Sequence, residues 1–184
     1  MENPQAPATY LVFAGYIDQI AVQRLFEATT HAIRAGSPSV HLLLQSVGGN
    51  IQDGVCLYNY FKTLPVPISI YNAGSVCSAA VTAYLGAPDR VTSALGTFMI
   101  HRTHATLQGA NADMVQARAQ SLVIDEDRMD RILKAHVRLP DDKLEVHRYA
   151  DVWLTANEAV DTGLATRLGD FAPPLGIPVF NVLA

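Results

Sequence analysis

Short, continuous apolar runs recur along the first half of the chain. They cover residues 9–15, 39–46 and 66–72, and none of them contains Asp, Glu, Lys or Arg. Runs of this kind are typical of strands that are buried on both faces of a sheet. Residues 90–95 and 97–101 predict two further short strands.

Segments with helical spacing separate these strands. Apolar residues predict a helix over 17–36, where Gly36 supplies a C-terminal stop. A second helix is predicted over 51–64, directly before two prolines that prevent its continuation. The small, apolar sequence 73–87 predicts a third helix, and a long one extends from about 111 to 136.

A capping box predicts one more helix near the C-terminus. Thr155 is the expected N-cap, Glu158 is its partner, and Gly163 closes the helix. Strands and helices thus alternate along the chain, which indicates an α/β fold with a largely parallel sheet. No repeat or linker interrupts this order, so residues 9–184 are predicted to form one domain after a flexible, Pro-rich segment over 1–8.

Composition and charge exclude several classes of protein. The chain has 184 residues, of which 49% are hydrophobic and 16% are charged, and this is a globular composition. A net charge of −4 and the absence of a Lys/Arg run argue against a nucleic-acid partner. No stretch approaches the ~20 apolar residues of a membrane span, and residues 1–10 do not resemble a signal peptide. Cys56 and Cys77 form no CxxC pair, which favours a reducing cytoplasm.

Ser78 is the first candidate for chemistry. It lies in the sequence Gly-Ser-Val-Cys-Ser-Ala-Ala, at the start of a predicted helix that follows a strand. Free backbone N–H groups and the positive end of the helix dipole gather at such a position and would stabilise an oxyanion formed there. Most serines at helix starts are caps, so this placement alone does not establish a catalytic site.

Two further features could complete a hydrolytic site. Gly48 and Gly49 close a buried strand, and their turn could direct an N–H group toward Ser78; a simple strand-to-helix turn is the alternative. His101 ends an apolar strand and has the pKa range needed to take a proton from serine. His104 lies nearby in a polar segment and competes for the same role.

The residues alone do not identify the acid of such a site. Asp151 could orient His101 and stabilise its charged form. Nothing local distinguishes Asp151 from Asp141, Asp142 or Glu145.

Four segments, taken in order, resemble the proteolytic subunit of the Clp protease. Ser-Val-Gly-Gly at 46–49 differs from the family's Ser-Pro-Gly-Gly only at the proline. The family's Gly-x-x-x-Ser and Met-Ile-His segments are matched at 74–78 and 99–101. The sequence 153–164 resembles the segment that follows the family's catalytic acid, and this match selects Asp151.

The resemblance implies peptide-bond hydrolysis through an acyl-enzyme, with no metal or organic cofactor. Ser78 would attack the carbonyl carbon, His101 would transfer the proton, and Asp151 would hold the imidazole. The backbone N–H groups of Gly49 and Ala79 would bind the oxyanion.

The resemblance also implies a fold and an assembly. The expected fold is crotonase-like, with repeated ββα units and a protruding strand-helix handle over about 102–136. In the family, subunits form heptameric rings, paired rings enclose the active sites, and a hexameric AAA+ ATPase supplies unfolded chains. The expected partners are therefore polypeptide substrates and further copies of this chain.

The chain departs from the family pattern in two places that leave alternatives open. The segment before the first strand is short and lacks the helix and axial loop that contact the ATPase, and Arg102-Thr103 replaces the common Gln-Pro. An ATPase-independent peptidase is therefore the first alternative. The others are a crotonase-like acyl-coenzyme A enzyme and an inactive subunit of a mixed ring, and a complete Ser-His-Asp set argues against both.

Overall fold

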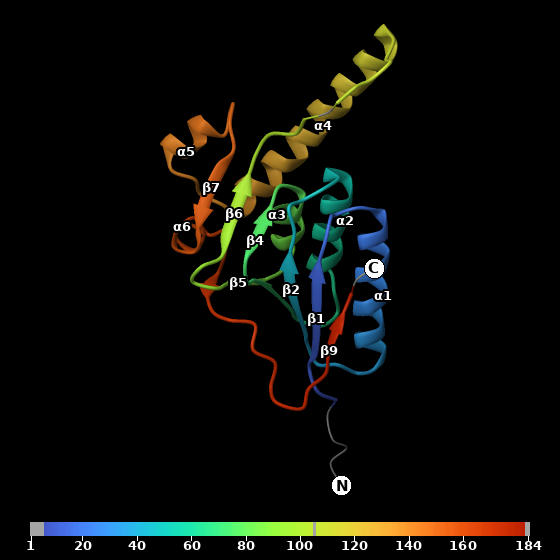
Figure 1. Ribbon diagram of the computed structural model, residues 1–184, viewed down its shortest axis with the longest axis vertical. Coiled ribbons are helices and arrows are strands. Elements are labelled where there is room, and N and C mark those ends of the chain that lie inside the picture. The colour runs from blue at the N-terminus through green and yellow to red at the C-terminus, as the bar shows by residue number, and fades with distance from the viewer. Residues whose placement is uncertain (1–5, 105, 183–184) are drawn as a thin grey trace.

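A parallel sheet forms the centre of the computed structural model, which describes residues 6–104 and 106–182 (Figure 1). Six strands lie in the order β8-β5-β3-β2-β1-β9, and every neighbouring pair is parallel. The strands of this sheet are β1 (Thr9–Ala14), β2 (Val40–Gln45), β3 (Ile68–Asn72), β5 (Asp89–Thr92), β8 (Arg167–Leu168) and β9 (Val179–Asn181). The predicted α/β class with a mostly parallel sheet is confirmed.

Alternating burial along the central strands explains how the helices pack on them. In β2, Val40, Leu42 and Leu44 are buried, whereas the residues between them are only partly covered. Because successive side chains of a strand point to opposite faces, one face of the sheet is the more deeply buried one. The helices that connect the parallel strands are α1 (Gln19–Arg34), α2 (Ile51–Lys62) and α3 (Ala79–Tyr84).

A second, smaller sheet lies beside the first and holds the residues of interest. It contains β4 (Ser75–Cys77), β6 (Thr97–Ile100) and β7 (Val152–Thr155), and its β6–β7 pair is antiparallel. The prediction of a helix over 73–87 was wrong in its first part, because residues 75–77 form a strand that pairs with β6. This pairing partner is distant in sequence, so local propensity could not reveal it.

The long predicted helix is confirmed as α4 (Ala112–His136), which projects away from the sheet in Figure 1. Met129 and Leu133, near its base, are buried. Met114, farther out, is 54% exposed. The outer half of α4 therefore carries apolar side chains that nothing in the described chain covers.

The C-terminal third contains one helix that the sequence predicted and one that it missed. The capping box of α6 (Ala156–Asp161) is confirmed: the Thr155 N–H donates to Glu158 at 2.8 Å, and this bond leads the causes that lower the pKa of Glu158 to about 2. Helix α5 (Asp141–Val146) was not predicted.

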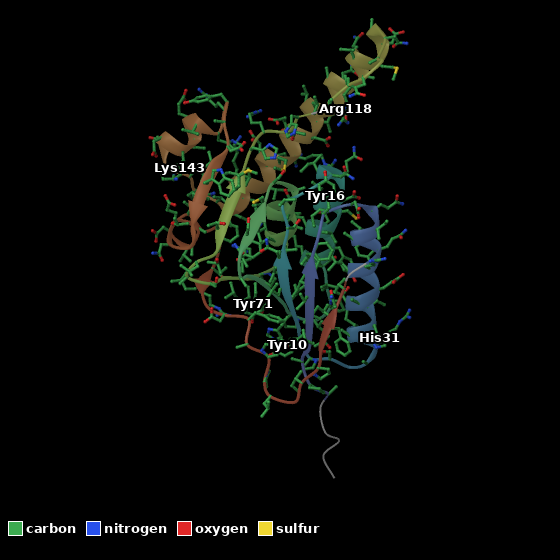
Figure 2. All side chains as sticks on the ribbon, in the orientation of Figure 1. Tyr10, Tyr16, His31, Tyr71, Arg118 and Lys143 are labelled. Atoms are coloured by element: carbon green, nitrogen blue, oxygen red, sulfur yellow. The ribbon has the colours of Figure 1, made fainter. Side chains whose placement is uncertain are left out.

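The last described strand, β9, was not predicted either. Residues 169–178 cross from β8 to the opposite edge of the sheet, where β9 pairs with β1. On the way, the Phe171 ring meets Tyr10 and Tyr71 edge-on, with centroids 5.7 and 5.4 Å apart; Figure 2 labels both tyrosines. This crossing segment covers part of the sheet face that His41 and Tyr10 share through a stacked ring contact.

Candidate active site

Ser78 lies between the end of β4 and the start of α3, in a strained backbone conformation. Its φ of 54° and ψ of −126° make it the one non-glycine residue with positive φ in the part of the chain that the structure describes. Its N–H donates to the Met99 carbonyl at 2.7 Å, which fixes the turn to the neighbouring strand β6. Strain of this kind is characteristic of functional sites, because it presents one side chain away from the regular elements.

His101 directly follows β6 and reaches the serine. The His101 Nε2 lies 2.7 Å from the Ser78 Oγ. Its other ring nitrogen, Nδ1, lies 2.7 Å from the carbonyl oxygen of Arg102. A carbonyl can only accept, so Nδ1 carries the proton and Nε2 offers its lone pair to the serine hydroxyl. This is the tautomer that a general base for Ser78 requires.

His104, the competing histidine, has a different position. Its ring lies beside that of His101, with centroids 5.1 Å apart, and it is exposed. Among the described residues, no hydrogen bond joins His104 to Ser78. The geometry therefore favours His101 over His104.

The glycine turn packs against the serine. A Cβ built on Gly48 would lie 2.7 Å from the Ser78 Cβ and 2.8 Å from the Cys77 carbonyl oxygen. On the other side, a Cβ on Gly49 would lie 2.1 Å from the Ile17 carbonyl oxygen. Only glycine allows this close approach, so the turn fits tightly between Ile17 and Ser78.

Two backbone donors near the serine lack a partner. Within the ranges 6–104 and 106–182, no hydrogen bond uses the N–H of Gly49 or that of Ala79. Ala79 opens α3, where the first N–H groups have no intrahelical acceptor. Both groups are thus free to donate, and their role as oxyanion donors stays a prediction.

Asp151 lies near His101 along the backbone, but its side chain is not engaged. The antiparallel register of β6 and β7 ends with Ile100 opposite Val152, so one further step sets His101 opposite Asp151. Asp151 is exposed, and no hydrogen bond or ion pair of its carboxylate occurs among the described residues. The role of Asp151 stays a prediction.

A buried histidine, His147, lies at the C-terminal end of α5. His147 is 8% exposed, and its Nε2 has no hydrogen-bond partner in the described part of the chain. Burial lowers the pKa of His147, and the nearby charge of Arg102 lowers it further. The lowered pKa disfavours the charged form of His147.

A pocket of about 370 Å³ opens next to His101. It is bounded by the glycine turn, the start of α2, the loop after β6 and the handle helix α4. Figure 2 labels Tyr16 on the body and Arg118 on α4, which both belong to its lining. Its walls include Asp53 and Asp125 as well as Arg118, so the pocket is polar and carries charges of both signs.

The described residues contain no cluster of three or more His, Cys, Asp or Glu side chains that could hold a metal ion. None of the described helices has the length and apolar character needed to cross a bilayer.

The sequence pattern missed the carbonyl of Arg102 as the partner of His101. A backbone carbonyl leaves no trace in residue identity, and the only signal was the unusual Arg102-Thr103 after the histidine. The paired glycines indicated a close approach at Gly48, but only the fold shows that Ser78 is the residue they approach.

Several known proteins are similar to this chain. A protein-family model described as Clp protease matches residues 14–170. The ATP-dependent Clp protease proteolytic subunit 3 of Rhizobium johnstonii is 25% identical over 156 residues, which cover 84% of this chain and 80% of that protein. The ATP-dependent Clp protease proteolytic subunit 2 of Gluconobacter oxydans is 25% identical over 162 residues, with 86% and 72% covered.

A solved structure shares the fold. A single-residue mutant of ClpP1 from Listeria monocytogenes superposes with a TM-score of 0.75 at 20% identity, and the match covers 89% of this chain and 91% of that one. At this identity the likeness concerns the fold alone. The family model, in contrast, spans most of the chain, including the glycine turn, Ser78, His101 and Asp151. The chain therefore belongs to the Clp protease family of serine peptidases.

Proposed function

We propose that this protein hydrolyses peptide bonds in unfolded proteins or peptides through an acyl-enzyme formed on Ser78. The observation that carries the proposal is the 2.7 Å contact between the Ser78 Oγ and the His101 Nε2, combined with a proton held on Nδ1. His101 takes the serine proton as the carbonyl carbon is attacked and passes it to the leaving amine. A water molecule then releases the acyl group by the same route in reverse.

The oxyanion of the tetrahedral intermediate is proposed to bind the N–H groups of Gly49 and Ala79. Both donors are unpaired among the described residues. Ala79 directly follows Ser78, and Gly49 directly follows Gly48, which packs against Ser78. Fixed donors of this kind stabilise the charge that develops in the transition state, and each contributes on the order of 10²–10³ in rate.

We further propose that the peptidase works as a homo-oligomeric ring or double ring. The exposed apolar residues on α4 support this, because a single chain leaves them uncovered; they are Met114, Val115, Val123 and Ile124. The relatives in Rhizobium and Gluconobacter are named as ATP-dependent, and on that ground an AAA+ ATPase is a candidate partner. The free cysteines Cys56 and Cys77 fit a cytoplasmic location.

Covalent labelling tests the proposed nucleophile. A fluorophosphonate is expected to inactivate peptide hydrolysis, and mass spectrometry of the digested protein is expected to locate a single adduct on Ser78. Native mass measurement of the same sample reports the oligomeric state. An adduct on another residue, with Ser78 unmodified and activity lost, would refute the assignment.

Asp151→Asn tests the third member of the proposed triad. Because the Arg102 carbonyl already holds the Nδ1 proton, Asp151 is expected to act mainly by stabilising the imidazolium charge. We expect kcat for a peptide substrate to fall about tenfold, which corresponds to about 1.4 kcal/mol. Steady-state kinetics check this. A loss near the roughly 10⁴-fold typical of an acid that alone sets the tautomer would show that Asp151 takes over Nδ1 during catalysis.

A further inference from the structure

The acceptor on His101 Nδ1 belongs to a loop that has no regular structure of its own. The Arg102 carbonyl lies in the segment between β6 and α4, outside any helix or strand. A loop carbonyl can rotate with its peptide plane, and it orients the imidazole only if that plane is held. The structure must therefore fix the Arg102–Thr103 peptide by some other contact.

That contact comes from the handle helix. The N–H of Thr103 donates to Oε1 of Glu126, and the Arg102 guanidinium pairs with Oε2 of the same carboxylate. Glu126 lies on α4, and its side chain is 18% exposed, whereas that of Arg102 is 42% exposed. One carboxylate thus binds both residues that follow the histidine.

The geometry of a trans peptide gives this contact a consequence. The Thr103 N–H and the Arg102 carbonyl belong to one planar peptide group and point in opposite directions. With its N–H held by Glu126, the group directs its carbonyl at His101 Nδ1, 2.7 Å away. A carboxylate on the N–H side also polarises the carbonyl as an acceptor, because hydrogen bonds in a chain strengthen one another.

We propose that Glu126 is a positioning residue for His101, and that it acts through the Arg102–Thr103 peptide. This inference rests on the proposed function, because it assumes that His101 is the general base for Ser78. The contact depends on Thr103, since proline, which is common at this place in the family pattern, has no N–H to donate. The handle helix is in this way connected to the tautomer of the base.

Two substitutions at Glu126 separate positioning from folding. Glu126→Ala removes the acceptor, and we expect kcat for a small peptide to fall roughly 10- to 100-fold with KM within about twofold, since misplacement of a catalytic group affects the chemical step. Glu126→Gln keeps a side-chain oxygen for the Thr103 N–H, and we expect kcat within about fivefold of the wild type. All rates are normalised to the fraction of sites that a fluorophosphonate titrates.

A double-mutant cycle tests whether Glu126 acts through the Arg102–Thr103 peptide. Thr103→Pro removes the N–H, replaces the threonine side chain with a ring and leaves the Glu126 carboxylate in place, so it should lower kcat by a similar factor. The double variant Thr103→Pro/Glu126→Ala should lose little more than either single variant, because both break the same chain of contacts. Multiplicative losses would mean that Glu126 acts independently of the peptide and would overturn the proposal.

Asp127→Asn is the matched control. Asp127 is the next residue on α4 and pairs with Arg131 on the surface, 3.7 Å away. We expect its kcat, KM and native mass to equal those of the wild type. Unchanged kcat in Glu126→Ala, or a loss that Glu126→Gln fails to restore, would also overturn the proposal. Neither result would touch the function proposed for Ser78, which the labelling experiment tests separately.

Discussion

Ser78→Ala is expected to lower kcat for peptide hydrolysis about 10⁶-fold, the scale seen when the nucleophile of a serine peptidase is removed. The substitution deletes the Oγ that lies 2.7 Å from His101 Nε2 and leaves both candidate oxyanion donors in place. Alanine has the same Cβ as serine, so the strain at φ 54° is unchanged. The melting temperature should therefore stay within a few degrees of the wild type.

Ser75→Ala provides the control for this experiment. Ser75 lies on β4, in the same short strand that leads to Ser78, and its Oγ contacts the Cys77 Sγ at 3.0 Å. Its hydroxyl has no role in the proposed chemistry, so hydrolysis and fluorophosphonate labelling should match the wild type. Residual activity of Ser78→Ala at about one-hundredth of the wild type or above, in a preparation free of contaminating peptidase, would refute Ser78 as the nucleophile.

Gly48→Ala is expected to cause the second-largest effect. The new Cβ would lie 2.7 Å from the Ser78 Cβ and 2.8 Å from the backbone oxygen of Cys77, so either the turn or the nucleophile must move. Displacement of the turn also moves the Gly49 N–H, and loss of one oxyanion donor alone costs about 10²–10³ in rate. The φ of +103° adds a torsional penalty of about 1–3 kcal/mol to stability.

Gly176→Ala separates the torsional penalty from the steric contact with Ser78. Gly176 has a φ of +84°, but nothing lies within 4 Å of a Cβ built on it. This variant should lose stability through backbone torsion alone and keep its full kcat. Thermal unfolding and peptide kinetics on both variants make the comparison. A Gly48→Ala enzyme that retains kcat would show that the turn is not in functional contact with Ser78.

The sequence could predict the site's members better than their geometry. Ser78 and His101 follow from residue type, order and the family resemblance, and the fold places their side chains 2.7 Å apart. The roles of Gly49, Ala79 and Asp151 stay predictions. Residue order alone could not reveal that residues 75–77 form a strand. They form β4 only because the folded chain brings them beside β6.

The remaining features depend on groups that residue identity does not encode. The Arg102 carbonyl and the Thr103 N–H are backbone atoms, and their roles arise only when the handle places Glu126 beside them. Strand β9 was missed for a related reason: a three-residue strand carries too weak a pattern, and its pairing with β1 is decided by the path of the preceding loop.

The backbone at Ser78 also bears on the stability of the fold. A glycine at this position would relieve the positive φ and would raise stability by about 1–3 kcal/mol, so a subunit that no longer needed a nucleophile could gain stability by a single exchange. This sequence has serine there, at the one described position where a non-glycine residue has a positive φ. Stability alone therefore does not account for a serine at this position.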